Sequence, residues 1–96
     1  MQVVIRKYSG TGAAELFDVL EEHAAELQDL MRPVQGLVSY TLARSSDGGF
    51  SVTVCQDKAG IEQSIQKAAD WIAKNAVDTQ AAAPQISVGD VVVHLK

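Results

Sequence analysis

The segment from Leu37 to Gln56 constrains the fold more than any other part of the chain, because two β-rich runs flank a turn-forming stretch, Ser45 to Gly49. If Arg44 pairs with Phe50, one face of the hairpin is apolar and the other is small and mostly polar, because strand side chains alternate. The apolar face carries Val38, Tyr40, Leu42, Phe50, Val52 and Val54, and the reverse face carries Ser39, Thr41, Ala43, Ser51, Thr53 and Cys55. We therefore predict that the apolar face packs on the core. The reverse face is then surface, the lining of a pocket, or a contact with a second subunit.

Two helical patterns and two further strand patterns surround this hairpin. Leucines recur at helical spacing over residues 13–31, and a second helix is expected from Asp57, a suitable N-cap, to about Asn75. Strand patterns at residues 2–8 and 86–95 complete the chain. The resulting order, β-α-β-β-α-β, predicts a ferredoxin-like α+β fold with two helices on one face of a four-stranded antiparallel sheet.

The size and composition of the chain fit one soluble globular domain spanning residues 1–96. A net charge of -4 leaves no basic patch for phosphates, so we expect no nucleic-acid partner. No apolar run is long enough to cross a membrane. The single Cys55 cannot form an internal disulfide, which fits a reducing compartment and favours the cytoplasm.

The layout of nearly the whole chain resembles the dimeric α/β-barrel superfamily, in particular small proteins of the antibiotic biosynthesis monooxygenase type. The resemblance depends on the helix over residues 13–31, on the second strand-helix unit, and on the run Pro33-Val34-Gln35-Gly36-Leu37-Val38-Ser39-Tyr40-Thr41-Leu42, in which a glycine opens a strand after the first helix. It implies a dimeric α/β barrel, a homodimer that closes the helix-free face of the sheet, and a cofactor-independent oxygenase acting on an aromatic or polyketide-like substrate.

One stretch departs from the family pattern. The family often has a glutamate and a tryptophan near the end of the third strand, whereas this chain reads Val52-Thr53-Val54-Cys55-Gln56-Asp57. The departure motivates a second hypothesis, a non-catalytic module that binds a small molecule or serves in assembly on the same scaffold. Whether the chain is an enzyme therefore stays open at this point.

His23 is the candidate catalytic residue. It lies near the leucine line of the first helix, so its imidazole points to the apolar side, where it would act as a general base or would orient a ligand. The alternative is a histidine at the edge of the core, paired with a backbone carbonyl or with the Tyr40 hydroxyl.

Four further residues are candidates for substrate binding: Tyr40, Trp71, Cys55 and His94. Tyr40 and Trp71 would form pocket walls, with ordinary packing as the alternative. Cys55 precedes the second helix, whose N-terminus could lower the thiol pKa; the alternative is a small half-buried residue. His94 would face the dimer cavity or solvent from the last strand. Because the two histidines are expected on opposite sides of the sheet, we predict no metal site, and the resemblance implies no cofactor.

Overall fold

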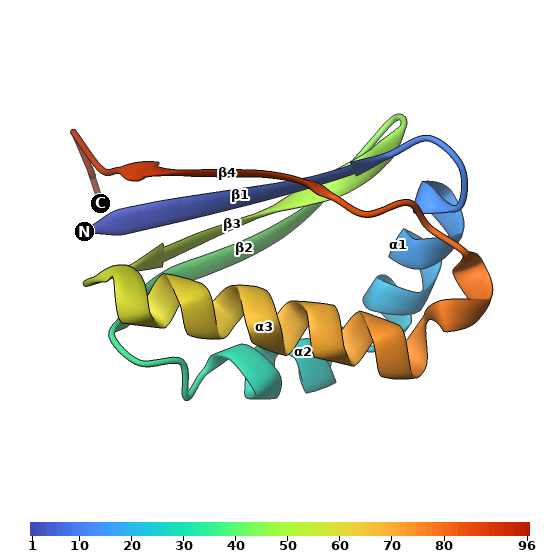
Figure 1. Cartoon of the computed structure of the whole chain (residues 1–96), viewed down its shortest axis with the longest axis horizontal. Coiled ribbons are helices and arrows are strands. Elements are labelled where there is room, and N and C mark those ends of the chain that lie inside the picture. Colours follow the sequence, from blue (N-terminus) through green and yellow to red (C-terminus); the bar gives the residue numbers. More distant parts are fainter.

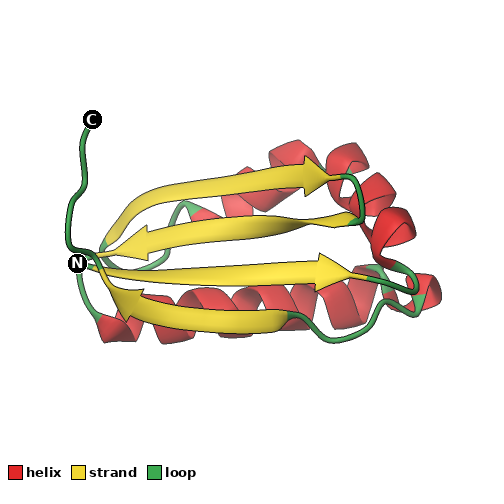
Figure 2. Ribbon diagram, turned by 90° about the horizontal axis from the view of Figure 1, so that it is seen from above, coloured by secondary structure: helices red, strands yellow, loops and turns green.

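The computed structural model describes residues 1–96 and consists of one four-stranded antiparallel sheet with all helices on one face (Figures 1 and 2). The elements are β1 (Gln2–Ser9), α1 (Ala13–Glu22), α2 (Ala24–Met31), β2 (Leu37–Ser45), β3 (Gly48–Cys55), α3 (Lys58–Asn75), the 3₁₀ helix η1 (Val77–Thr79) and β4 (Gln85–Asp90). The strand order is β2-β3-β1-β4. The predicted ferredoxin-like α+β fold is confirmed.

The first helical segment is split rather than continuous. His23 leaves the helical conformation, with φ -109° and ψ 25°, and separates α1 from α2. The break lets both halves turn an apolar face towards the curved sheet, so that Leu16 and Leu20 of α1 and Leu27 and Met31 of α2 are all buried.

Helix α3 begins where the sequence predicts. The Asp57 side chain caps the helix by accepting a hydrogen bond from the Gly60 amide (3.4 Å). The buried side chains of α3 recur every three or four residues, as expected for a helix that packs one face on a sheet. They are Ile61, Ser64, Ala68 and Trp71.

The hairpin is confirmed, but its predicted register is wrong by one residue. Ser46 and Asp47 alone form the turn, and Arg44 pairs with Gly49 instead of Phe50. A shift of one residue exchanges the two faces of a strand. Residues Ser51, Thr53 and Cys55 therefore lie beneath the helices at 0% exposure, and Phe50, Val52 and Val54 lie on the helix-free face with Ser39, Thr41 and Ala43.

A contact with α1 explains this register. Gly49 lies directly beneath the Phe17 ring, so that a Cβ atom at this position would collide with the ring. In the predicted register Phe50 would stand opposite Arg44, and its large side chain would compete with Phe17 for the same space. Only a glycine fits here, and the pairing of β2 with β3 follows from its position.

The last strand is shorter than predicted. Strand β4 ends at Asp90, which pairs with Gln2 at the beginning of β1, and Val91 adds one bond to the carbonyl of Met1. Beyond this point β1 offers no further partner. The tail Val92–Lys96 is exposed, so His94 lies outside the sheet, in contrast to the prediction.

The core lies between the sheet and the helices in two clusters. One is built around Phe17, Tyr8 and Trp71, and the other around Met31 and Ile61. The opposite face of the sheet carries no helix, as Figure 2 shows from above. None of the helices combines the length and the apolar character needed to cross a bilayer.

Candidate functional site

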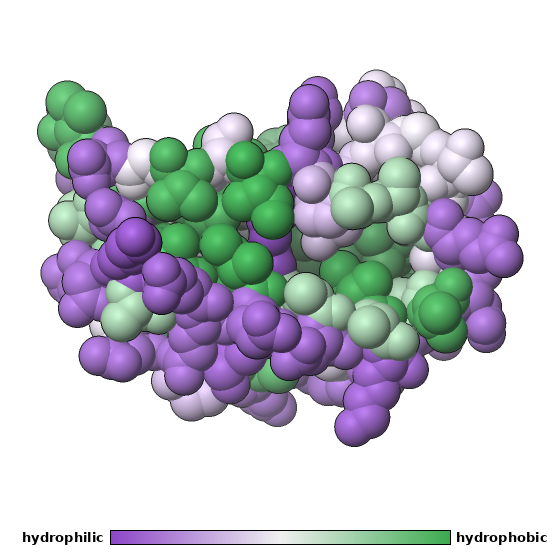
Figure 3. Space-filling view, viewed as in Figure 1, coloured by the Kyte–Doolittle hydropathy of each residue, from purple (hydrophilic) through white to green (hydrophobic).

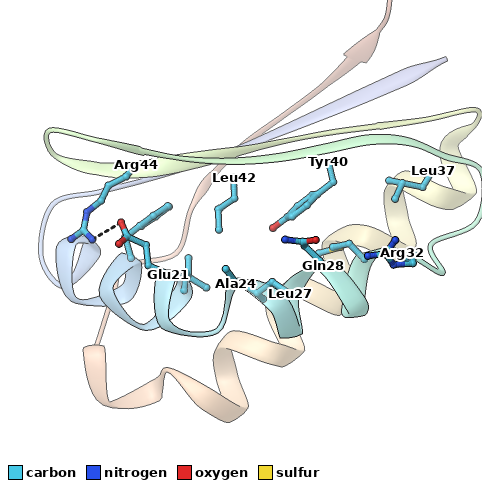
Figure 4. A pocket seen from close by; sticks show the side chains of 12 residues that line it. Glu21, Ala24, Leu27, Gln28, Arg32, Leu37, Tyr40, Leu42 and Arg44 are labelled. Atoms are coloured by element: carbon cyan, nitrogen blue, oxygen red, sulfur yellow. Dashed lines mark hydrogen bonds and ion pairs between the residues drawn. The ribbon is translucent and has the colours of Figure 1, made fainter.

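A cleft of about 510 Å³ opens between the edge strand β2 and helices α1 and α2 (Figure 4). Its volume lies within the range of about 300–1,000 Å³ that is typical of small-molecule pockets. Most of the residues that line the cleft are hydrophobic, among them Leu20, Ala24, Leu27, Leu37 and Leu42. Such a cleft suits a ligand with an apolar body.

Tyr40 supplies a polar group inside the cleft. Strand alternation places it on the helix side of β2, and Figure 4 shows its hydroxyl directed across the cleft towards the helices. Burial raises the pKa of Tyr40, although the nearby positive charge of Arg6 opposes this effect. The hydroxyl therefore stays protonated at neutral pH and can donate a hydrogen bond to a ligand.

Two arginines lie at the borders of the cleft. Arg44 is held by Asp18 (2.8 Å) and Glu21 (2.9 Å), and these hydrogen bonds raise its pKa. It also donates to the Ala14 carbonyl (3.0 Å), so it joins β2 to α1 and its charge is neutralised. Arg32 lines the cleft without an ion pair, which leaves its charge available to a ligand.

A smaller inner cavity of about 20 Å³ lies behind the cleft and has room for a single water molecule. Five residues line both spaces: Leu20, Leu27, Met31, Tyr40 and Leu42. The rest of the inner wall is formed by Arg6, Tyr8, Ser51, Ala68, Trp71 and Ile72. The cleft thus ends close to the centre of the sheet.

Arg6 is the site residue that the sequence analysis missed. It is only 3% exposed, and its Nε donates to Ser51 Oγ (3.1 Å). A signal was present, because alternation along β1 places Arg6 on the same face as the core residues Val4 and Tyr8. A charged residue at a core-facing position of a strand is rare, and this rarity indicates a functional role.

His23 lies beside the site rather than in it. Its ring packs edge-on against Trp71 at 5.5 Å between centroids, and its Nδ1 is 3.2 Å from Glu26 Oε1. The Trp71 indole donates to the other oxygen of Glu26 (2.7 Å), which lowers the pKa of Glu26. His23 lines neither the cleft nor the inner cavity, and its catalytic role stays a prediction.

Of the other predicted binding residues, Tyr40 lines the cleft and Trp71 lines the inner cavity. Cys55 is buried beneath the helices instead of lying half-buried on the reverse face, because of the register shift. Burial raises the pKa of its thiol, and the negative charge of Asp57 adds to this effect. His94 lies on the exposed tail. No group of three or more His, Cys, Asp or Glu side chains is arranged to hold a metal ion.

No protein-family model and no curated protein matches the sequence. Solved structures match almost the whole chain. A protein of unknown function from Nitrosomonas europaea has a TM-score of 0.69 and 17% identity, over 99% of this chain and 91% of that chain. The monooxygenase ActVA-Orf6 of Streptomyces coelicolor, in complex with Nanaomycin D, has a TM-score of 0.68 and 16% identity, over 99% of this chain and 90% of that chain.

Two further structures extend this result. SnoaB, a cofactor-independent oxygenase from Streptomyces nogalater, has a TM-score of 0.59 and 16% identity, over 98% of this chain and 94% of that chain. A dimeric ferredoxin-like protein from an uncultured marine organism has a TM-score of 0.63 and 15% identity, over 99% of this chain and 95% of that chain. The chain therefore has the ferredoxin-like fold of antibiotic biosynthesis monooxygenase-type proteins, and the predicted resemblance is confirmed for the fold.

Proposed function

We propose that the cleft between β2 and helices α1 and α2 binds a planar aromatic molecule and oxygenates it without a cofactor. The observation that carries this proposal is the cleft itself, which combines apolar walls with the hydroxyl of Tyr40. The fold shared with ActVA-Orf6 and SnoaB supports the type of reaction.

The reaction requires little from the protein. A ring CH₂ group loses a proton to solvent at the mouth of the cleft, because no lining side chain is a free base, and the resulting electron-rich anion reduces dioxygen. One oxygen atom becomes the new carbonyl, and the other takes up the equivalent of both CH₂ hydrogens and leaves as water, so that the carbon supplies all four electrons. The apolar walls exclude water, and the Tyr40 hydroxyl donates a hydrogen bond to the oxygen on which negative charge develops.

A second candidate function is binding without catalysis in the same cleft. It is favoured by the absence of a free proton acceptor among the lining residues. Glu21 is engaged by Arg44, and His23 lies outside the cleft. A protein of this kind would hold the aromatic molecule without consuming oxygen.

Anthrone oxidation tests the proposal, because one anthrone and one dioxygen give one anthraquinone and one water. The substitution Ala24→Trp fills the cleft from an exposed position of α2, and Ala25→Trp is the matched control on the same exposed turn. We expect oxygen uptake in the wild type, its loss in Ala24→Trp, and a rate within twofold of wild type in Ala25→Trp. Tyr40→Phe should lower the rate by about 100-fold.

The outcomes separate the two functions. Uptake that survives Ala24→Trp would exclude the cleft as the site of reaction. If the wild type binds anthrone but takes up no oxygen, and Ala24→Trp abolishes this binding, the protein binds without catalysis.

We further propose that two copies associate through the helix-free face of the sheet. Ile5, 41% exposed, lies on this face with the partly buried Phe50 and Val52. The similarity to a dimeric ferredoxin-like protein supports this arrangement.

A further inference from the structure

Arg6 is a buried positive charge without a negative partner in the chain. None of the twelve Asp and Glu side chains forms an ion pair with it. The residues that line the space between α3 and β4 next to Arg6 include no Asp or Glu, and Figure 3 shows apolar side chains over β4 and along the neighbouring side of α3. Burying a charge without a counter-charge is costly, so such groups are normally paired or bind a ligand.

The guanidinium group of Arg6 extends from β1 over β3 to two hydroxyl groups. Its Nε donates to Ser51 Oγ (3.1 Å), and the guanidinium also forms a hydrogen bond with the side chain of Tyr40. All three residues line the inner cavity behind the cleft. The positive charge therefore lies at the inner end of the cleft, next to a hydroxyl group that faces the cleft.

The Tyr40 hydroxyl links this charge to the cleft. A guanidinium group has donors only, so the Tyr40 oxygen accepts from Arg6 and keeps its own proton. Burial raises the pKa of Tyr40, and the charge and the hydrogen bond of Arg6 oppose this effect. Because Figure 4 shows the hydroxyl directed across the cleft, its proton can be donated to a ligand. A positive charge behind the donor strengthens such a bond when the acceptor is an anion.

A single donor with a positive charge behind it matches one class of anion. Carboxylates and phosphates are typically bound by pairs of donors, as in a bidentate arginine pair. A phenolate or an enolate instead carries its charge on one oxygen attached to an apolar ring. The cleft offers the hydroxyl of Tyr40 for that oxygen and leucine-rich walls for the ring.

We propose that the cleft binds its aromatic ligand as an oxyanion, a phenolate or an enolate, with the oxygen on the Tyr40 hydroxyl and the charge balanced by Arg6 through that hydroxyl. Arg6 is then a positioning residue that determines the charge preference of the cleft without touching the ligand. The inference names the substrate class of the proposed function and rests on the same cleft as its ligand site. It holds equally for binding without catalysis.

4-Nitrophenol tests the charge preference, because its phenolate absorbs visible light and its phenol does not. A pH titration of the bound molecule therefore measures its pKa directly. We expect the pKa of bound 4-nitrophenol to be at least one pH unit lower than that of the free molecule, so that the phenolate binds at least tenfold more tightly than the phenol. A bound pKa equal to or above the free value, or no binding, would overturn the proposal.

Substitutions assign this effect to Arg6. In Arg6→Met the pKa of bound 4-nitrophenol should return to the free value or rise above it. Lys7→Met is the matched control, because it removes the same charge from the exposed, helix-free side of the same strand, and the lowered pKa should persist. If Arg32→Met abolishes the lowering and Arg6→Met does not, the anion lies at the mouth of the cleft and the proposal is wrong.

Tyr40→Phe tests the link without altering Arg6, so it stays informative if Arg6→Met does not fold. Phenylalanine keeps the ring and removes the hydroxyl, and we expect the lowering of the ligand pKa to decrease. An undiminished lowering would exclude Tyr40 as the link. The cleft-filling Ala24→Trp should abolish 4-nitrophenol binding, and binding that survives it would place the phenol outside the cleft and overturn the proposal.

These outcomes are independent of turnover, because 4-nitrophenol has no CH₂ group to oxygenate. Anthrone that is bound but not oxidised would contradict the oxygenase function and leave the phenolate preference intact. Anthrone oxidation together with an unchanged pKa of bound 4-nitrophenol would contradict the oxyanion site and leave the oxygenase function intact.

Discussion

At the scale of single residues, the centre of the sheet is polar where a small core would normally be apolar. Ser51 and Thr53 lie at 0% exposure on the helix face of β3. Ser51 accepts a hydrogen bond from Arg6, but the Thr53 hydroxyl has no partner. An unsatisfied buried hydroxyl costs about 1–3 kcal/mol.

We therefore expect Thr53→Val to increase the free energy of unfolding by about 1 kcal/mol, because it removes the unsatisfied hydroxyl and keeps the side-chain volume. The control is Thr11→Val, at an exposed position of the turn before α1, with a change below about 0.5 kcal/mol. Urea denaturation measures both. Destabilisation by Thr53→Val would indicate that a bound water satisfies the hydroxyl.

Three buried groups predict a loss of stability at alkaline pH. Burial raises the pKa of Tyr8, Tyr40 and Cys55 above their ordinary values of 10.0, 10.0 and 9.0. The folded protein holds these protons to a higher pH than the unfolded chain does. The stabilisation is therefore complete below the unfolded pKa and is lost as the pH rises through the folded pKa.

The urea midpoint should accordingly be steady near pH 8 and should fall above pH 9, the ordinary pKa of Cys55. In Cys55→Ala the overall midpoint is lower, because a small cavity forms, but the first part of the alkaline decline is shallower. A wild-type midpoint that stays constant up to pH 11 would contradict the assignment.

The site residues show how far sequence reasoning reaches at this scale. Tyr40 was expected on the core side of its strand, and it lies there because strand alternation fixes its direction; its role in binding stays a prediction. His23 was expected within one continuous helix, but the helix breaks at that residue, which lies at the edge beside Glu26 and Trp71. If His23 is nevertheless the base, His23→Gln will abolish anthrone oxidation and preserve anthrone binding; unchanged turnover would remove this role.

At the scale of elements, periodicity was sufficient for the first three strands, for α3 and for its Asp57 cap, because these depend on neighbouring residues. The register of the hairpin was not predictable in this way, since both registers give alternating pairs. Gly49 and Phe17, whose contact decides between them, lie on different elements. The break between α1 and α2 has no local signal either, because neither glycine nor proline marks it.

The role of Gly49 can be tested directly. Gly49→Ala places a methyl group against the Phe17 ring and should lower the free energy of unfolding by about 1–3 kcal/mol. Gly89→Ala, in β4, is the control, because nothing lies within 4 Å of the added Cβ. We expect it to be neutral or slightly stabilising. A Gly49→Ala protein as stable as Gly89→Ala would exclude the contact with Phe17 as the constraint on this position.

At the scale of the whole molecule, the register shift gives the helix-free face its character. Phe50 and Val52 were predicted to lie in the core, and instead they lie on this face with Ile5. Large apolar surfaces of this kind are typical of contacts between subunits.

A charge on this face should prevent the proposed association. In sedimentation experiments the wild type is expected to be a dimer and Ile5→Lys a folded monomer. Val77→Lys, at an exposed apolar position outside the sheet, is the control and should remain dimeric. A dimeric Ile5→Lys would exclude the helix-free face, and a monomeric wild type would exclude the dimer itself.

The position of Gly49 has a consequence for how stability depends on concentration. The hairpin directs Phe50 and Val52 outwards, so in the proposed dimer they would stabilise the pair of chains rather than the isolated chain. Folding and association would then be linked by mass action. The denaturation midpoint of the wild type should rise with protein concentration, whereas that of the folded Ile5→Lys monomer should not.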